Sequence, residues 1–220
     1  MSLRAAVITF PGSNCDRDLA VAMDRIFGQP ASRVWHGDTE MPKVDVIGVP
    51  GGFAYGDYLR CGAIAARSPI MAEVVRRAND GVLVIGICNG FQVLTEAGLL
   101  PGALIRNASL RFVCHQTDLE IVTTDSAFTR KFSKPASVRL PVAHNDGNYF
   151  CDPETLHELE TEDRIAFRYR DNPNGSTADI AGVLNTGRNV LGLMPHPERA
   201  IEPLLGGDDG LKIFASMMAT

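Results

Sequence analysis

The stretch Val82-Leu83-Val84-Ile85-Gly86-Ile87-Cys88-Asn89-Gly90 decides the fold of this chain. Residues 82–87 form a nearly unbroken apolar run, which predicts a strand buried on both faces, as in a parallel sheet. A helix over residues 89–97 is predicted to begin directly after this strand, with Gly98 as its C-terminal cap. A buried strand followed at once by a helix is the repeating unit of an α/β fold.

The turn between this strand and helix reads Gly-x-Cys-x-Gly, the cysteine form of the Gly-x-Ser-x-Gly nucleophile elbow. Gly86 and Gly90 supply the small residues that such a tight turn needs. The helix would point its N-terminal amides at the sulfur and favour the thiolate. Cys88 is therefore the candidate nucleophile, and a buried cysteine in a glycine-rich turn is the alternative interpretation.

The rest of the chain extends this unit in both directions. In the first half we expect strands at 4–9 and 44–49 and helices at 16–27 and 70–78. In the second half we expect strands at 109–115 and 119–123, paired with each other, and at 137–142, 164–169, 178–184 and 190–194, then a helix at 210–218. The acidic segment 152–163 is expected to be a solvated helix face. The prediction is one domain, residues 1–220: a three-layer, flavodoxin-like α/β fold with a central, largely parallel sheet, helices on both faces and an antiparallel extension.

Composition narrows the class of protein. The 220 residues are 45% hydrophobic and 21% charged, with a formal net charge of −5. This balance argues against a nucleic-acid binder that works by neutralising phosphates, and no apolar run approaches the length of a membrane span. The five cysteines are scattered without a Cys-x-x-Cys pair, which indicates reduced thiols, a cytoplasmic location and no metal site.

A cysteine nucleophile needs a base and a residue that orients the base. The segment Met194-Pro195-His196-Pro197-Glu198 follows the last predicted strand. Residues two apart in an extended segment point the same way, so Glu198 can hold the tautomer of His196. A structural loop at a strand end is the alternative, and His144 is the rival base.

A reaction at a carbonyl also needs donors for the developing oxyanion. Gly51 and Gly52 follow the predicted strand at 44–49 and can present backbone N–H groups that no Cβ obstructs. The amide of Asn89, the residue after the nucleophile, is the natural second donor. A plain turn is the alternative for the glycine pair.

The order Gly-Gly, Cys, His-x-Glu resembles the class I (triad) glutamine amidotransferases. More specifically, the chain resembles the family of glutaminase subunits of phosphoribosylformylglycinamidine synthase, in purine biosynthesis. The matching stretches, spread over nearly the whole chain, are 10–16 (FPGSNCD), 50–60 (PGGFAYGDYLR), 86–92 (GICNGFQ), 107–112 (NASLRF), 172–176 (NPNGS) and 192–199 (GLMPHPER).

The resemblance implies that Cys88 is the nucleophile of a glutaminase and that His196 and Glu198 complete its triad. It implies oxyanion donors at Gly52 and Asn89. It also implies a group of residues near the bound glutamine, namely Gln92, Asn107, Ser109, Arg111 and Phe112. The family usually has His-Gly-Glu-Gly where this chain has His144-Asn145-Asp146-Gly147, so roles carried over to this loop are not assured.

The resemblance further implies that ammonia passes to a separate synthetase subunit, which uses ATP, magnesium and formylglycinamide ribonucleotide. A third, small subunit is usual in bacterial versions, and no cofactor is expected in this chain itself. A free-standing cysteine hydrolase of the same superfamily and a non-catalytic α/β binding module are the alternatives. Segment 53–60 carries three aromatic residues and is expected either to respond to the partner or to plug the core.

Overall fold

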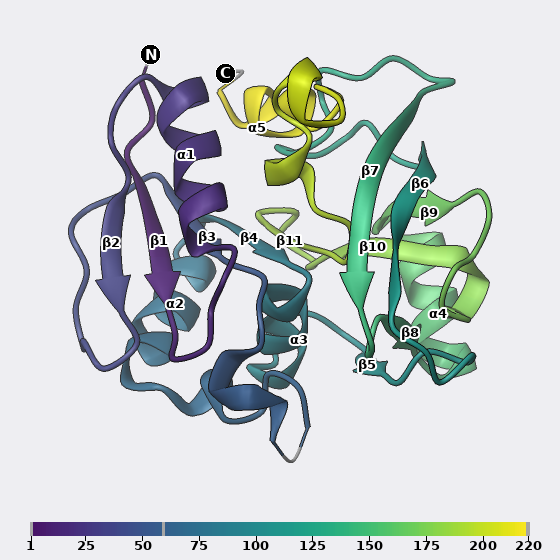
Figure 1. The fold of residues 1–220 in the computed structure, drawn as a ribbon, viewed down its shortest axis with the longest axis horizontal. Coiled ribbons are helices and arrows are strands. Elements are labelled where there is room, and N and C mark those ends of the chain that lie inside the picture. Colours follow the sequence, from purple (N-terminus) through teal and green to yellow (C-terminus); the bar gives the residue numbers. More distant parts are fainter. Residues whose placement is uncertain (1, 59, 219–220) are drawn as a thin grey trace.

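The computed structural model describes residues 2–58 and 60–218. The chain alternates strands and helices in its first half and is mostly β in its second (Figure 1). The strands are β1 (Ala5–Thr9), β2 (Ser32–Trp35), β3 (Val46–Val49), β4 (Leu83–Ile87), β5 (Ala103–Ile105), β6 (Val113–Ile121), β7 (Ser137–His144), β8 (Asn148–Phe150), β9 (Ile165–Tyr169), β10 (Ile180–Leu184) and β11 (Val190–Leu193). The α-helices are α1 (Asp16–Phe27), α2 (Pro69–Asn79), α3 (Asn89–Glu96), α4 (Pro153–Thr161) and α5 (Leu211–Met217).

The main sheet has the strand order β2-β1-β3-β4-β11-β10-β9-β6-β7. The first five strands in this order are parallel, and the other four continue the sheet in antiparallel fashion. The parallel part has the flavodoxin-like order, with β11 in the place of a fifth strand. The predicted fold class, a three-layer α/β fold with an antiparallel extension, is confirmed.

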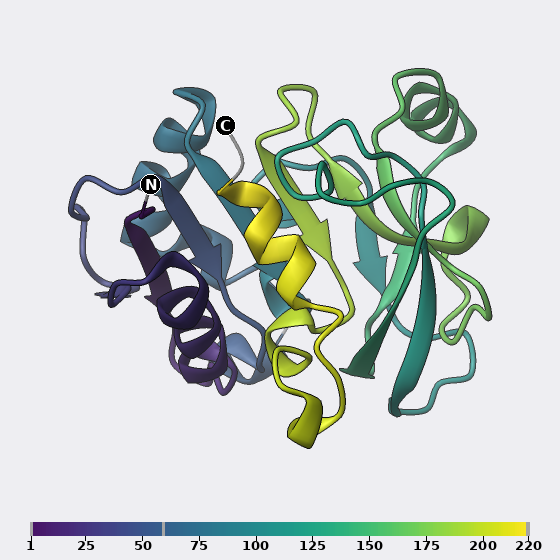
Figure 2. The same ribbon diagram turned by 90° about the horizontal axis from the view of Figure 1, so that it is seen from above.

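The connections decide which helix covers which face of the sheet. The chain moves from β1 through α1 toward one edge and from β3 through α2 toward the other edge. Right-handed crossovers in opposite directions place α1 and α2 on opposite faces. In Figures 1 and 2, α1 and α5 lie together on one face, and α2 and α3 lie on the other.

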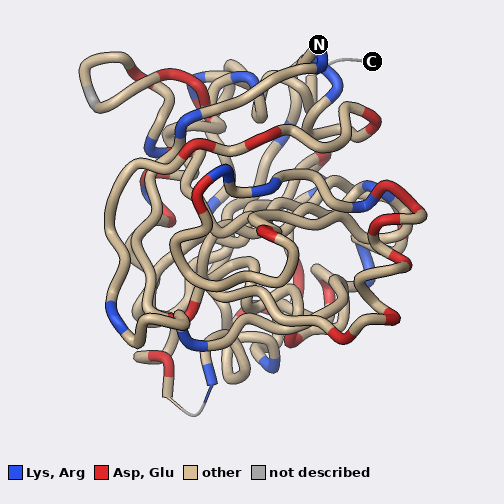
Figure 3. Tube along the Cα trace, turned by 90° about the vertical axis from the view of Figure 1, so that its right-hand side faces the viewer, with Lys and Arg blue, Asp and Glu red and all other residues tan. Residues whose placement is uncertain are grey.

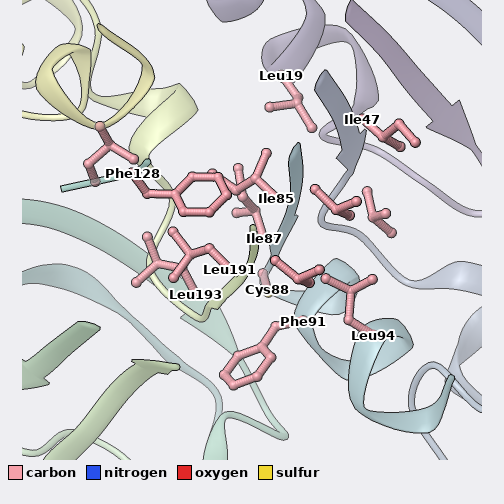
Figure 4. Packing of buried hydrophobic residues seen from close by; sticks show 14 of the residues in the cluster. Leu19, Ile47, Ile85, Ile87, Cys88, Phe91, Leu94, Phe128, Leu191 and Leu193 are labelled. Carbon is pink, nitrogen blue, oxygen red and sulfur yellow. The ribbon is translucent and has the colours of Figure 1, made fainter. Parts of the chain in front are cut away.

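The core is densest around the central strands. Figure 4 shows the isoleucines of β4 beside the leucines of β11, with Leu19 of α1 above them and Phe91 of α3 below. These side chains are fully buried. Gly48 of β3 allows α1 to approach, because a Cβ there would lie 2.7 Å from Leu19 Cδ2.

The pairing of strands in the second half differs from the sequence prediction. Segments 109–115 and 119–123 do not pair with each other. Residues 113–115 of the first and 119–121 of the second belong to the single strand β6, which pairs with β7 on one side and β9 on the other. The polar residues 116–118 read as a turn. In the structure Thr117 is buried while Asp118 faces solvent, so the alternation of a half-buried strand continues through them.

Three short strands were not predicted from the sequence, whereas the acidic helix was. The edge strand β2 buries only Val34, and β5 and β8 are three residues each, so none of the three has a strong sequence pattern. The acidic segment 152–163 forms α4, whose only buried residue is Leu159. This agrees with the predicted solvated helix.

Charges of both signs are interspersed along the outer loops and strands of the antiparallel side (Figure 3). None of the helices within residues 2–58 and 60–218 combines the length and the apolar character needed to cross a membrane. All five cysteines are free thiols.

Candidate active site

Cys88 lies at the sharp turn from β4 into α3, with φ 51° and ψ −109°. Residues other than glycine rarely adopt this backbone conformation, and it persists only where the surrounding structure enforces it. Gly90 makes the turn possible, because a Cβ there would lie 2.0 Å from the carbonyl oxygen of Val49. The turn has the geometry of a nucleophile elbow, as the Gly-x-Cys-x-Gly spacing predicts.

His196 and Glu198 follow β11, the strand beside β4. His196 Nδ1 lies 2.6 Å from Glu198 Oε1, and both side chains are shielded from solvent. The Cys88 N–H donates to the carbonyl oxygen of Leu193 at 2.8 Å, so the backbone of the elbow is tied directly to the segment that carries His196. The sequence prediction that Glu198 lies beside His196 agrees with this geometry.

The electrostatics of His196 depend on its two acidic neighbours. Burial by itself disfavours the imidazolium, but the Glu198 carboxylate and the Cys88 sulfur outweigh burial and raise the pKa of His196 above its usual value. His196 Nδ1 is hydrogen-bonded to Glu198, and His196 Nε2 has no hydrogen-bond partner among the described residues. Nε2 is therefore the nitrogen left to exchange a proton.

Gly51 lies beside the side chains of both Cys88 and His196. A Cβ on Gly51 would lie 2.9 Å from His196 Cε1 and 3.3 Å from Cys88 Cβ. A side chain at this position would displace the imidazole, so glycine is required for the close approach. Gly52 adopts φ 139°, and its position beside Ser13 and Asn14 also leaves no room for a Cβ.

The candidate oxyanion donors meet at the carboxyl edge of the parallel strands. Gly51 and Gly52 follow β3, and the N–H of Asn89 is at the first position of α3, where it has no intrahelical acceptor. The Asn89 side chain is buried and accepts a hydrogen bond from the Ala54 N–H at 3.1 Å. It thereby fixes the loop that follows the two glycines.

A cavity of about 190 Å³ opens beside Cys88. Its wall is formed by loops that converge from distant parts of the sequence. The lining residues are Gly52, Phe53, Gly56, Asp57, Cys88, Gln92, Ala143, His144, Asn145 and Asp146. Larger hollows lie elsewhere on the surface, but this one contains the candidate nucleophile.

The residues expected near glutamine fall into three groups. Gln92 lines the cavity, accepts from Asn89 Nδ2 at 2.8 Å and donates to the Asp146 carbonyl at 2.6 Å. Asn107 is fully buried behind the wall and does not line the cavity. Ser109, Arg111 and Phe112 are exposed on the loop before β6 and are not among the cavity's lining residues.

His144, the rival base, also lines the cavity, but its environment differs from that of His196. Its Nδ1 lies 3.1 Å from the amide oxygen of Asn107, not from a carboxylate. Burial, with a smaller contribution from His196, lowers the pKa of His144 to about 4. His144 is therefore neutral at pH 7.

Cys15 and Arg199 are site neighbours that the sequence analysis did not single out. Arg199 Nη2 lies 3.0 Å from Cys15 Sγ, and donor atoms of Cys15, His196 and Glu198 lie within 4.8 Å of one another. A Cys/His/Glu group of this kind can in principle hold a metal ion, but the guanidinium on the sulfur disfavours a cation there. The signal for them in the sequence was that they lie in the matching stretches 10–16 and 192–199.

A family model and the most similar curated proteins point to the same family. Residues 2–206 match the CobB/CobQ-like glutamine amidotransferase domain. The subunit PurQ of phosphoribosylformylglycinamidine synthase from Cereibacter sphaeroides is 63% identical over 217 residues, covering 98% of this chain and 97% of that protein. The PurQ subunit from Zymomonas mobilis is 60% identical, with 98% of each chain covered.

A solved structure supports the same relationship. A chain in the structure of PurLQS from Thermotoga maritima superposes with a TM-score of 0.91 at 46% identity, covering 99% of this chain and 98% of that one. The similarity in sequence and in fold therefore extends over nearly the whole chain.

Proposed function

Because this chain belongs to the family of CobB/CobQ-like glutamine amidotransferase domains, we propose that it is the glutaminase subunit of a phosphoribosylformylglycinamidine synthase. The observation that carries the proposal is the placement of Cys88 at a strained elbow, with the buried His196–Glu198 pair on the adjacent strand. The sequence identity of 60–63% to PurQ subunits, over 98% of this chain, supports a role in purine biosynthesis.

In the proposed reaction the Cys88 thiolate attacks the side-chain carboxamide carbon of glutamine. The N–H groups of Gly51 or Gly52 and of Asn89 hold the oxyanion. His196 Nε2 protonates the departing ammonia, which leaves a glutamyl thioester on Cys88. The same nitrogen then takes a proton from water, and the resulting hydroxide attacks the thioester carbonyl. The C–S bond breaks, glutamate leaves, and the Cys88 thiolate and the His196 imidazolium are restored. Glu198 holds the tautomer and stabilises the imidazolium.

The proposal extends to the rest of the complex. The ammonia is delivered to a synthetase subunit that converts formylglycinamide ribonucleotide to formylglycinamidine ribonucleotide with ATP and magnesium, and a small third subunit completes the assembly. The chain acts as one glutamine amidotransferase domain in the cytoplasm. Support comes from the continuous main sheet, the free thiols and the relationship to a chain of PurLQS.

The test is release of glutamate and ammonia from glutamine by the full chain, with and without the synthetase subunit. A glutamine-analogue electrophile should label Cys88 stoichiometrically. Cys88→Ala should abolish both, whereas Cys114→Ala is the matched control, because Cys114 is an exposed free thiol on β6. Labelling that follows Cys114, or hydrolysis of γ-glutamyl peptides in preference to glutamine, would contradict the proposal.

A further inference from the structure

The cavity beside Cys88 carries an unbalanced negative charge. Asp57 and Asp146 both line it, and no Lys or Arg does so in the part of the chain that the structure describes. Their nearest donors are neutral: Asn89 Nδ2 lies 3.2 Å from Asp57 Oδ1, and Cys61 Sγ lies 3.4 Å from Asp146 Oδ2. Two carboxylates in one small cavity, without a cation, are an arrangement that a positively charged ligand group would stabilise.

The backbone is held in an unusual conformation that places Asp57 there. Tyr55, Gly56 and Asp57 are consecutive left-handed residues, with φ 55°, 72° and 52°. The Tyr55 hydroxyl fixes the loop through His36 Nδ1 at 2.6 Å. Burial raises the pKa of Asp57, hydrogen bonding by Cys61 and Asn89 partly offsets this effect, and the charge of Asp146 adds to it, so the carboxylate lacks a full counter-charge.

His144 gives an independent indication of the ligand. The amide of Asn107 is oriented by its contacts: its nitrogen donates to the carbonyl oxygens of Arg111 and His144, and its oxygen accepts from the Gly147 N–H. This oxygen can only accept, so His144 Nδ1 carries the proton and donates to it. Nε2 of the neutral ring is then a bare acceptor.

His144 is 3% exposed, and its Nε2 has no partner within the described residues. The polar side chains of Asp57, Asp146 and His144 therefore all present acceptors to the same cavity. A ligand that satisfies them must bring N–H donors and positive charge.

We propose that Asp57 and Asp146 form the subsite that binds the α-ammonium group of glutamine. The inference rests on the proposed glutaminase function and adds to it a basis for selectivity. The subsite would admit the free amino acid and reject substrates whose α-nitrogen is acylated or absent, including glutamine within a peptide. The carboxamide end of the same molecule would then reach Cys88.

The test compares glutamine with 4-carbamoylbutanoate, which is glutamine without its α-amino group, and with Nα-acetylglutamine. Hydrolysis is measured with the full chain in the presence of the synthetase subunit. We expect the wild type to prefer glutamine by at least about a hundredfold in kcat/KM. Asp57→Asn and Asp146→Asn should each lower kcat/KM for glutamine at least about tenfold and leave the two poor substrates nearly unchanged, so that the preference shrinks.

Two further variants separate binding from structural damage. Asp146→Glu keeps the charge and should retain most of the preference. Asp125→Asn, at a side chain that is 89% exposed, is the matched control and should change nothing. In the Cys88→Ala background, calorimetry should show weaker glutamine binding on Asp57→Asn, without the complication of turnover.

The outcomes distinguish this inference from the function on which it rests. If the wild type does not hydrolyse glutamine, the proposed function fails and the subsite fails with it. If it does, but Asp57→Asn and Asp146→Asn slow all three substrates equally, the carboxylates only hold the loops and the subsite alone is overturned. A wild type that uses 4-carbamoylbutanoate as well as glutamine also overturns the subsite alone.

Discussion

The N–H of Cys88 donates to the carbonyl oxygen of Leu193 at 2.8 Å, which joins the turn after β4 to the end of β11. Parallel neighbours in a sheet end at the same edge, so the candidate nucleophile and the residues that follow β11 are brought together by sheet register. His196 needs only three residues beyond Leu193 to reach the sulfur.

Replacing Cys88 tests both chemistry and strain. Cys88→Ala and Cys88→Gly should each lose glutaminase activity by several orders of magnitude, because nucleophile and base act as a unit. Ammonia-dependent synthesis by the assembled complex should survive. Cys88→Gly should unfold at a higher temperature than Cys88→Ala, since φ 51° is strained for alanine by about 1–3 kcal/mol and the greater unfolded-state entropy of glycine offsets only about 0.5–1 kcal/mol. An alanine variant that melts above the glycine variant would show that the turn is not strained.

Replacing the residues of the proposed base should give graded losses. His196→Ala should be as damaging as loss of the thiol, Glu198→Gln should be milder, and His144→Ala should retain far more activity than His196→Ala. Glu198 raises the pKa of His196, so Glu198→Gln lowers it. Because the imidazolium protonates ammonia, the alkaline limb of the rate profile should move to lower pH. An inactive His144→Ala beside an active His196→Ala would show that His144, and not His196, is the base.

His144 should make stability depend on pH in a defined window. Its pKa is lowered from 6.5 to about 4 in the folded chain, so between these values the unfolded state binds more protons. Wild-type stability should therefore fall as pH drops from 6.5 to 4, by about 3 kcal/mol from this group alone. His144→Gln, whose amide can still donate to Asn107, should lack this component. Chemical denaturation at pH 7 and pH 4.5 measures the difference, and parallel curves for both proteins would refute it.

The synthetase subunit should activate this chain. We expect low glutaminase activity in isolation and a rise of at least about tenfold with the synthetase and its nucleotide ligands, as aligned oxyanion donors contribute about 10²–10³-fold each. In segment 53–60, Leu59 lies outside the described residues, Tyr55 is anchored to His36, and Phe53 and Tyr58 are 44% and 75% exposed. Phe53→Ala and Tyr58→Ala should reduce the activation ratio. Equal rates with and without the partner would contradict the prediction.

The sequence predicts best what is local. The elbow at Cys88 and the pair His196 and Glu198 each lie within a few residues of a strong apolar strand, so their placement follows from periodicity and turn chemistry. The cavity wall could not be predicted, because Asp57 and Asp146 meet only after the loops following β3 and β7 converge. Asn107 was expected near glutamine from resemblance alone, and only the folded structure places it behind His144.

The link between Cys88 and Leu193 also limits how the enzyme can be controlled. Cys88 and the segment that leads to His196 begin at the ends of two adjacent, buried central strands, so the core sets the spacing between their backbones. The loops that complete the cavity wall, around Gly52 and Asn145, lie outside these two strands. The proposed machinery thus divides into a half fixed by the sheet, which holds the nucleophile and the base, and a half carried by loops, which holds the glycine oxyanion donors and the cavity wall. A signal from outside can act on the second half alone.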